Sequence, residues 1–394
     1  MHNPLQVLKH YWGYDGFRPG QAEVIDSILS GHDTLALMPT GGGKSITFQV
    51  PALANPGICL VVSPLVALMK DQVKNLQKRG ILSAFISSEM PHWEILQQLD
   101  NCILGDYKFL YISPERISSE LFQEKLKTLS RKVNLLVVDE AHCISQWGND
   151  FRRDYRLIAD IRDVIPHVQV IAVTASATAA VVADICEQLH FRKGYRIFKT
   201  SFERKNLSFV VRKTDNKLKE ICHILSAVPG SAVIYSRTRK GVEEYAGKLR
   251  AAGISAEYFH AGLDPVLKTE RQADWVKGFT RVLVATNAFG MGIDKGDVRV
   301  VIHTEFPDSM EAYYQEAGRA GRDGKRAYAV ALLGPQDITD IKRRPSNAFP
   351  TIEYIKRVYE ALCNRFQIAE GDGEGVSVYL DEPEFLRDWH FDKG

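Results

Sequence analysis

Short apolar runs alternate with amphipathic stretches along most of this sequence, and the alternation predicts its secondary structure. In the first half, apolar runs indicate strands at 35–38, 58–62, 84–86, 109–112, 135–138 and 168–173. The intervening stretches indicate helices at 65–78, 91–104, 115–128 and 155–164, and residues 5–31 also have a helical pattern. Continuous apolar strands separated by helices are typical of a parallel sheet that is covered on both faces.

The same alternation returns in the second half. It predicts strands at 232–235, 256–259, 282–285, 300–303 and 327–333, and helices at 239–251, 264–278 and 309–318. The basic stretch 192–211 interrupts the pattern, and we interpret it as a linker. We therefore expect an α/β protein with two parallel-sheet domains, 1–199 and 200–335, followed by a short, mostly helical segment, 336–394, with a helix at 343–364.

Ligands of parallel sheets bind at the carboxyl ends of the strands, and the first strand is followed by Thr40-Gly41-Gly42-Gly43-Lys44-Ser45. Glycines let successive backbone N–H groups surround a phosphate, Lys44 adds a positive charge, and the Ser45 hydroxyl is placed to bind Mg²⁺. A strict phosphate loop has glycine where Met38 stands, so this is a variant loop. An unrelated glycine-rich turn is the alternative, but the flanking strand and helix favour nucleotide binding.

Two acids, Asp139 and Glu140, follow the strand predicted at 135–138. Asp139 is placed to hold Mg²⁺ through water, and Glu140 to orient and deprotonate an attacking water. Adjacent acids can also simply mark the N-terminus of a helix. Because a phosphate loop precedes them in the same sheet, we favour the catalytic interpretation.

Further polar groups suggest contacts with a base and with nucleic acid. Gln21 can pair with the edge of adenine and Arg18 can stack on its face, although this stretch also fits a loop that starts a helix. Residues 143–153 combine two aromatic side chains with two arginines, which suits stacking on bases and contact with phosphates. A loop whose Trp147 and Phe151 merely cover the domain surface is the alternative.

Near the end of the second predicted domain, Arg319 and Arg322 are three residues apart among small residues. If this stretch is helical, both arginines lie on one face. Such a pair can act as arginine fingers on a nucleotide, although a helix end with exposed arginines would look the same.

Composition narrows the class of protein. The 394 residues are enough for two to three domains, and a net charge of only +2 limits any nucleic-acid site to a local patch. No apolar run approaches the length of a membrane span, and the first residues do not resemble a signal peptide. The six cysteines are scattered, without a Cys-x-x-Cys pair, which argues against disulfides and against a four-cysteine zinc module.

The segments that carry these motifs together resemble the RecQ family of superfamily 2 DNA helicases. They are 17–21, 38–45, 139–142, 146–152 and 315–324, in the family's order, within a match of roughly 5–335. The resemblance implies two RecA-like domains and an ATP-dependent 3′→5′ DNA helicase that translocates on single-stranded DNA and unwinds duplexes in repair and recombination. It implies ATP and Mg²⁺ as cofactors and single-stranded and partially duplex DNA as substrates.

The resemblance also assigns roles to residues. The expected nucleotide-binding residues are Arg18, Gln21, Thr40, Gly41, Gly42, Gly43, Lys44, Ser45 and Asp294. The expected catalytic residues are Lys44, Asp139, Glu140, Arg319 and Arg322, with Ser45 and Asp139 at the metal. Trp147 and Phe151 are expected to contact nucleic acid, and His142 would couple this loop to the ATP site. Independently of the resemblance, we expect further nucleic-acid contacts at Arg152, at Arg237 and at two polar strand ends, which carry Ser63, Lys70, Gln72 and Arg116. Either strand end could instead be an ordinary helix cap. We expect a cytoplasmic, nucleoid-associated monomer without a membrane contact, with single-stranded-DNA-binding and repair proteins as further partners.

Two other functions stay open. An RNA helicase or a translocase would use the same motor, and stimulation by DNA or by RNA would separate them. A nucleic-acid-binding scaffold without productive hydrolysis would need a damaged catalytic set, but Lys44, Asp139, Glu140, Arg319 and Arg322 are all present.

The sequence departs from the RecQ pattern after residue 335, where most members carry a four-cysteine zinc module and then a winged helix. Here the segment contains Cys363 and His390 but no cysteine pair. Because a closed zinc site needs four ligands, we predict that the chain contains no structural zinc, which elemental analysis tests. We also predict that this chain tracks along a strand better than it unwinds a duplex. Stoichiometric zinc, or robust unwinding of a long blunt duplex, would contradict these expectations.

Overall fold

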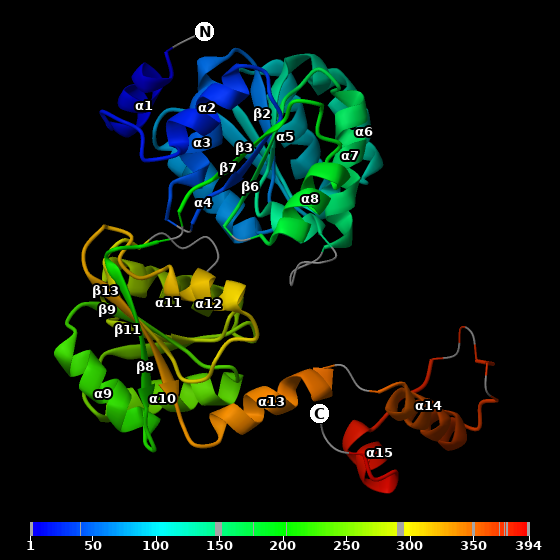
Figure 1. The fold of residues 1–394 in the computed structure, drawn as a ribbon. Coiled ribbons are helices and arrows are strands. Elements are labelled where there is room, and N and C mark those ends of the chain that lie inside the picture. The colour runs from blue at the N-terminus through cyan, green and yellow to red at the C-terminus, as the bar shows by residue number, and fades with distance from the viewer. Residues whose placement is uncertain are drawn as a thin grey trace. The chain divides into compact units, whose positions relative to one another are not determined.

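The computed structural model describes residues 3–39, 41–145, 152–175, 177–201, 203–289, 295–348, 351–369, 371–373, 375 and 377–391. The chain forms two compact units, one made of residues 1–211 and 218–331, the other of residues 212–217 and 332–394. The larger unit contains two parallel-sheet lobes, which confirms the predicted α/β class (Figure 1).

The first lobe is built on a seven-stranded sheet in the order β3-β4-β2-β5-β6-β1-β7. Its strands are β1 Thr34–Leu37, β2 Ile58–Val62, β3 Ser83–Ile86, β4 Phe109–Ile112, β5 Val133–Val138, β6 Val170–Thr174 and β7 Arg196–Lys199. Its α-helices are α1 Pro4–Trp12, α2 Gln21–Leu29, α3 Lys44–Ala54, α4 Val66–Gln77, α5 His92–Leu104, α6 Glu120–Leu129, α7 Ile158–Val164 and α8 Ala179–Gln188. Short 3-10 turns lie at Pro114–Arg116, Ser130–Lys132, Ala141–Ile144 and Arg153–Leu157.

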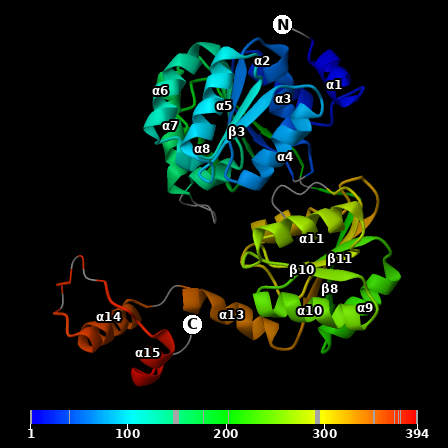
Figure 2. The same cartoon turned by 180° about the vertical axis from the view of Figure 1, so that it is seen from behind.

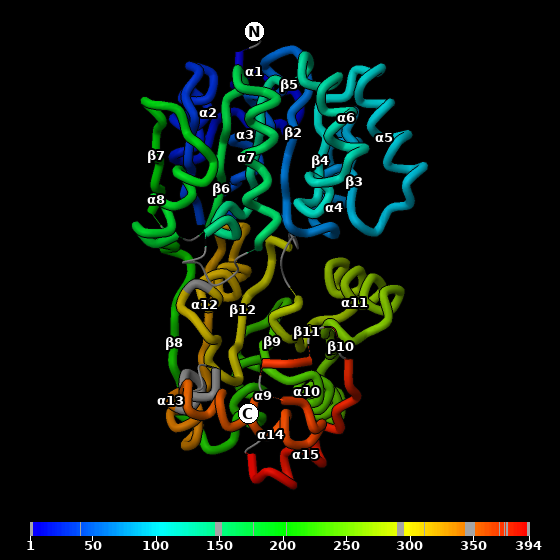
Figure 3. The backbone as a smooth tube through the Cα atoms, turned by 90° about the vertical axis from the view of Figure 1, so that its right-hand side faces the viewer, coloured from blue at the N-terminus to red at the C-terminus, as the bar shows by residue number. Residues whose placement is uncertain are grey.

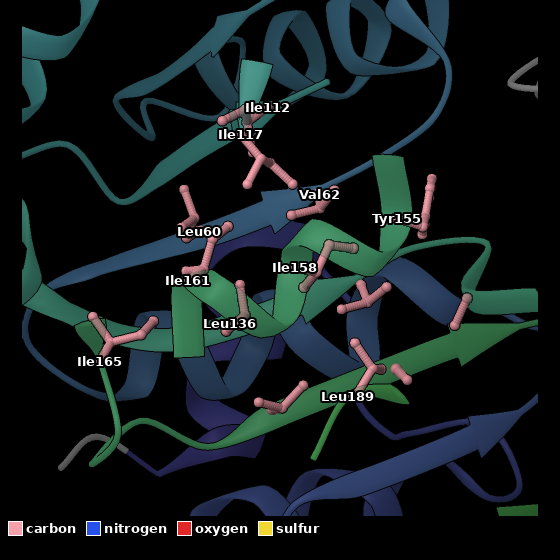
Figure 4. Close-up of a cluster of buried hydrophobic side chains, with 14 of the residues drawn as sticks. Leu60, Val62, Ile112, Ile117, Leu136, Tyr155, Ile158, Ile161, Ile165 and Leu189 are labelled. Carbon is pink, nitrogen blue, oxygen red and sulfur yellow. The ribbon is translucent and has the colours of Figure 1, made fainter. Parts of the chain in front are cut away.

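Alternate residues of each strand pack against opposite helix layers because side chains in a strand alternate between faces. In β2, Leu60 and Val62 join the cluster that includes helices α5 to α8, and part of this cluster is shown in Figure 4. Cys59 and Val61 of the same strand join the cluster that includes helices α1 to α4. Both faces of the sheet are therefore dry, which explains the unbroken apolar strands. Figures 1 and 2 show the two helix layers from front and back.

The second lobe has a six-stranded sheet in the order β10-β11-β9-β12-β13-β8. Figure 3 labels its strands β8, β9, β10, β11 and β12. Its strands are β8 Leu207–Lys213, β9 Ser231–Tyr235, β10 Ala256–Phe259, β11 Val282–Ala285, β12 Val298–His303 and β13 Ala327–Leu333. Its helices are α9 Lys217–Ala227, α10 Arg239–Ala251, α11 Pro265–Lys277 and α12 Met310–Ala317. Trp275 of α11 is buried against this sheet, and its indole N–H donates to the carbonyl of Ala232 at 3.1 Å.

The smaller unit carries helices α13 Asp337–Ala348, α14 Ile352–Phe366 and α15 Glu382–Asp388. Tyr354, Val358 and Leu362 lie at intervals of four residues, a spacing that indicates packing, and they do pack against a small core that includes Phe385 of α15. The predicted single helix at 343–364 is wrong, because two helices cover that range. The Thr351 hydroxyl caps the start of α14 by accepting from the N–H of Tyr354.

The interpretation of 192–211 as a linker is also wrong, because β7 lies within this range and β8 begins there. Strand β7 pairs in parallel with β1, in the register Thr34↔Arg196, and β8 lies beside β13. Three of the four β7 side chains are exposed at this edge of the sheet. An edge strand is tolerant of charged side chains, so it lacks the apolar run by which the interior strands were predicted.

A buried ion cluster around Asp33 ties together four parts of the first lobe. Asp33 is 1% exposed. Its carboxylate accepts from the backbone N–H of Val170 at 3.0 Å and of Arg192 at 2.7 Å, from Arg192 Nη2 at 3.0 Å, and from the Arg162 guanidinium. Burial alone raises the pKa of Asp33, but the hydrogen bonds from Arg192, Val170 and Arg162 outweigh it and hold the pKa below its usual value.

We predict that Asp33→Asn lowers the free energy of unfolding by about 3–5 kcal/mol, because it leaves a buried arginine without its counter-charge. Because the folded-state pKa is lowered, this contribution exists above about pH 4 and is lost as the pH falls further. Urea unfolding at several pH values tests this. The exposed Asp26→Asn serves as the matched control, with an expected change of about 0.5 kcal/mol or less. Equal stability of the two variants would contradict the prediction.

Candidate nucleotide site

The glycine loop connects the end of β1 to the start of α3. Met38 N–H donates to the carbonyl of Thr174 at 3.0 Å, which holds the strand end in the sheet, and α3 starts at Lys44. Gly43 has φ +78°, and a Cβ there would lie 2.4 Å from Gln21 Nε2. Glycine is therefore required at this position for two reasons: the backbone is left-handed, and the Gln21 side chain leaves no room for a Cβ. The N-terminus of α3 faces the space where a phosphate would bind.

Gln21 and Arg18 lie against the backbone of this loop. The Gln21 side chain is 3% exposed, and its Nε2 donates to the carbonyl of Gly43 at 3.0 Å. Its Oε1 accepts from the N–H of Arg18 at 2.9 Å, and Arg18 Nη1 donates to the carbonyl of Gly41 at 2.8 Å. Both side chains thus brace the loop, while their predicted contact with adenine stays a prediction.

The two acids follow β5, as the sequence predicted. Asp139 accepts from the Ser63 hydroxyl at 3.5 Å and from the N–H of Glu140 at 2.9 Å. Lys44 Nζ lies 3.5 Å from Glu140 Oε1, so the loop lysine and the second acid form an ion pair. Glu140 has φ 46°, in the left-handed region that costs an L-residue roughly 1–2 kcal/mol. The strained backbone occurs at the residue predicted to act on water.

Burial, and next to it the carboxylate of Glu140, raises the pKa of Asp139, while Lys44 and His142 act in the opposite direction. A carboxylate whose ionisation is opposed in this way gains from a cation beside it. The Ser45 hydroxyl and the Asp139 carboxylate line the same cavity, and such oxygen donors suit Mg²⁺. The donor set therefore fits the predicted metal.

His142 connects the acids to the neighbouring strand. Its Nδ1 lies 2.9 Å from the Thr174 hydroxyl at the end of β6, and 3.5 Å from Glu140 Oε2. Tyr155, fully buried, donates its hydroxyl to the carbonyl of Asp139 at 2.9 Å. These contacts fix the backbone around both acids.

One cavity of about 800 Å³ collects most of the predicted nucleotide-site residues, although Gly42 is not in its lining. Its lining includes Arg18, Gln21, Gly41, Gly43, Lys44, Ser45, Asp139, Glu140, Arg319 and Arg322. Arg319 is 9% exposed, and a Cβ built on Gly41 would lie 3.2 Å from Arg322 Cγ, so the stem of Arg322 passes close to the loop. Thr40 and Asp294 lie outside the described residues.

Of the residues predicted to contact nucleic acid, some lie outside the described residues and others lie beside the candidate nucleotide site. Trp147 and Phe151 lie outside the described residues. Ser63 is buried beside Asp139, and Gln72 lines the cavity and accepts from Gln49 at 3.1 Å. These two residues therefore belong with the nucleotide site in this structure.

The remaining four residues make intramolecular contacts. Arg116 donates to the carbonyls of Ser87 and Ser88 at 2.9 and 3.0 Å, and Arg152 to that of Pro64 at 3.0 Å. Lys70 pairs with Glu89 at 3.3 Å and Arg237 with Asp308 at 2.7 Å, and these last two pairs are exposed. Exposed pairs are weak, so Lys70 and Arg237 can exchange their partners for phosphates more easily than Arg116 can.

Sequence reasoning missed two groups near the arginines. His303 Nε2 lies 2.8 Å from Glu316 Oε2 in a buried pair that joins β12 to α12. Arg204 and Asn206, within the supposed linker, bond to backbone carbonyls of residues 318–325. Neither group belongs to a local motif, and only the His303–Glu316 pair joins two ionisable residue types that a sequence could reveal.

Fold and site together define a phosphate-loop protein with two tandem RecA-like lobes. Two family models match it, the DEAD/DEAH box helicase over residues 18–185 and the helicase conserved C-terminal domain over residues 216–324. The crystal structure of the DUF1998 helicase MrfA bound to DNA and AMPPNP has a TM-score of 0.72 at 17% identity, covering 88% of this chain and 52% of that one. This likeness shows the fold alone.

Two relatives with similar sequences show to which family of helicases the chain belongs. The ATP-dependent DNA helicase RecQ of Bacillus subtilis is 43% identical over 341 residues, which are 86% of this chain and 57% of that protein. The probable ATP-dependent DNA helicase RecS of the same bacterium is 40% identical over 337 residues, 84% of this chain and 67% of that protein. The chain belongs to the RecQ family of superfamily 2 helicases, and it spans 54–57% of the length of three RecQ relatives. Within the described residues, no helix has the length and apolar character to cross a membrane.

The left-handed backbone of Glu140 yields a stability prediction. Glycine adopts this conformation without strain, whereas glutamine does not. We expect Glu140→Gly to have a free energy of unfolding about 1 kcal/mol higher than Glu140→Gln, since both variants lack the carboxylate and differ at the backbone. Urea unfolding of the two variants measures the difference. A glycine variant that is less stable than the glutamine variant would show that Glu140 is unstrained.

Proposed function

We propose that this chain is the motor of an ATP-dependent 3′→5′ DNA helicase, which translocates on single-stranded DNA and unwinds duplexes in repair and recombination. The observation that carries the proposal is the single cavity lined by the glycine loop, by Asp139 and Glu140, and by Arg319 and Arg322. Phosphoryl transfer needs a phosphate cradle, a water-orienting group and added positive charge, and these residues supply one of each.

In this proposal the first lobe holds the triphosphate. The backbone N–H groups of residues 41–45 and the Lys44 ammonium bind its β- and γ-phosphates. Ser45 and Asp139 hold Mg²⁺, which neutralises charge on the phosphates when bound. Glu140 orients a water and accepts its proton, and the ion pair with Lys44, 3.5 Å in this structure, opens when a phosphate takes the lysine.

The second lobe contributes the arginines. Arg319 and Arg322 stabilise the charge that develops on the γ-phosphate, an effect worth about 10³–10⁵ in kcat for arginine fingers. Hydrolysis therefore depends on how the turn that carries them is held. The contact between His142 and Thr174 is suited to relay changes at the acids to the strand ends that border the second lobe.

DNA binding is inferred from the family and from the loop at 143–153, whose aromatic residues and arginines suit stacking and phosphate contact. Separating one base pair requires about 1.4 kcal/mol on average, well within what the hydrolysis of one ATP supplies. An RNA helicase is the second candidate, and it shares every residue of the ATP site. Comparison of DNA and RNA as stimulants separates the two.

The remaining assignments are part of the same proposal. We propose that the domains are 1–199, 200–335 and 336–394. We also propose ATP and Mg²⁺ as cofactors, without zinc, and single-stranded and partially duplex DNA as substrates. We also keep a monomer in a bacterial cytoplasm, near the nucleoid, with single-stranded-DNA-binding and repair proteins as partners.

We predict that single-stranded DNA stimulates ATP hydrolysis by the full chain more strongly than single-stranded RNA does. Lys44→Ala should abolish turnover, and Glu140→Gln should lower kcat by about 10²–10⁴ while ATP still binds, because an amide cannot accept the proton. Steady-state hydrolysis and equilibrium binding of a fluorescent ATP analogue measure both quantities. Glu124→Gln, an exposed carboxylate on α6, is the matched control and should behave like wild type.

Each result bears on a different part of the proposal. Turnover of Glu140→Gln within a few-fold of wild type would refute its role as the base. Hydrolysis that ignores DNA but responds to RNA would replace the proposed function with the second candidate.

A further inference from the structure

The turn that carries both arginines is closely packed around Gly321. This glycine has φ +63°, and its N–H donates to the carbonyl of Val298 at 2.9 Å. A Cβ there would lie 2.6 Å from Asn206 Nδ2 and 2.9 Å from the Ala327 Cβ. The path of the backbone between Arg319 and Arg322 is therefore set by what surrounds residue 321.

Arg204 is bonded to three backbone carbonyls of this turn. Its Nη2 donates to Ala320 at 2.9 Å and to Gly321 at 2.7 Å, and its Nη1 donates to Gly318 at 3.3 Å. Asn206 adds bonds of 2.8 Å each from its Nδ2 to the carbonyls of Gly321 and Lys325. Two side chains thus satisfy carbonyls on both sides of Arg319 and Arg322.

Two opposing electrostatic effects act on the Arg204 guanidinium at this contact. Gly318 caps the C-terminus of α12, where the carbonyls carry partial negative charge and attract a cation. The Arg204 guanidinium is partly withdrawn from water, and this burial, and after it the charge of Arg18, lowers the pKa of Arg204. Hydrogen bonds to charged groups strengthen under such conditions.

Arg204 also lies close in sequence to strand β7 and Thr200, which hold the end of β1 just before the glycine loop. Strand β7 pairs with β1, and the next residue, Thr200, donates its N–H to the carbonyl of Leu37 at 3.0 Å. Leu37 ends β1 just before the loop. Only a few residues therefore separate the bond that holds the end of β1 from the bonds that hold the arginine turn.

We propose that Arg204 is a positioning residue for Arg319 and Arg322, which fixes their turn in the geometry that ATP hydrolysis requires. The proposal rests on the proposed function, since it concerns the same reaction. It predicts an effect on kcat more than on KM, because arginine fingers act chiefly on the transition state. It also predicts that lysine cannot replace arginine, since one ammonium does not reproduce a planar fork with three acceptors.

The test compares Arg204→Ala and Arg204→Lys with a matched control in the same lobe. Arg281 also donates to three backbone carbonyls, those of Gly230, Leu225 and Val228, but none of them is in the arginine turn. Arg281→Ala therefore removes a similar set of bonds without touching the turn. We use the full chain with saturating single-stranded DNA and measure kcat and KM for ATP.

We expect both Arg204 variants to lose about 10² in kcat, the effect of a displacement of roughly 1 Å, with KM within about threefold of wild type. The kcat of Arg281→Ala should stay within about threefold of the wild-type value, even if the free energy of unfolding of this variant falls. In a double-mutant cycle, Arg204→Ala should slow an Arg322→Ala background by much less than it slows wild type. A kcat loss shared by Arg281→Ala, full rescue by lysine, or additivity in the cycle would each overturn the proposal.

Amide hydrogen exchange of residues 318–325 provides a readout that needs no turnover. Exchange should be faster in Arg204→Lys than in wild type and unchanged in Arg281→Ala. A wild-type chain without DNA-stimulated hydrolysis would refute the proposed function, whereas unchanged exchange in Arg204→Lys would refute the positioning role. The two failures are thus distinguishable.

Discussion

Parallel pairing of the four central strands β2, β5, β6 and β1 is the constraint on which the nucleotide site depends. Their carboxyl ends meet at one edge of the sheet, because parallel strands all run the same way. Asp139 N–H donates to the carbonyl of Val62 at 2.9 Å, and Met38 N–H to that of Thr174 at 3.0 Å. The glycine loop, Ser63, the two acids and Thr174 are neighbours for this reason alone.

The same edge concentrates groups that are unfavourable for stability. A buried carboxylate with a raised pKa and a left-handed glutamate both oppose folding. The sheet tolerates them because both its faces are buried in continuous apolar clusters. The site is thus assembled for binding a cation and a triphosphate, and the core beneath it holds a geometry that the site residues by themselves would not adopt.

Features with a local signature could be predicted from the sequence. Interior strands such as β2 are apolar on both faces, and the loop at 41–45 and the acids at 139–140 follow such strands directly. Strand β7 escaped prediction because an edge strand with exposed, basic side chains lacks that signature. Asp33 escaped because its partners, Arg162 and Arg192, are more than 120 residues away, and only the folded sheet brings them together.

The side chains that hold the glycine loop and the arginine turn donate to backbone carbonyls, and sequence reasoning therefore missed these contacts as well. In the first lobe Gln21 donates to the carbonyls of Gly42 and Gly43, and in the second lobe Arg204 donates to those of Gly318, Ala320 and Gly321. A carbonyl is present at every position, so such an acceptor leaves no mark in the sequence. Glycine-rich turns expose these carbonyls and lack side chains that could fix the turn from within. A loop that needs glycine to approach a phosphate therefore needs a donor from elsewhere in the fold to hold it in place.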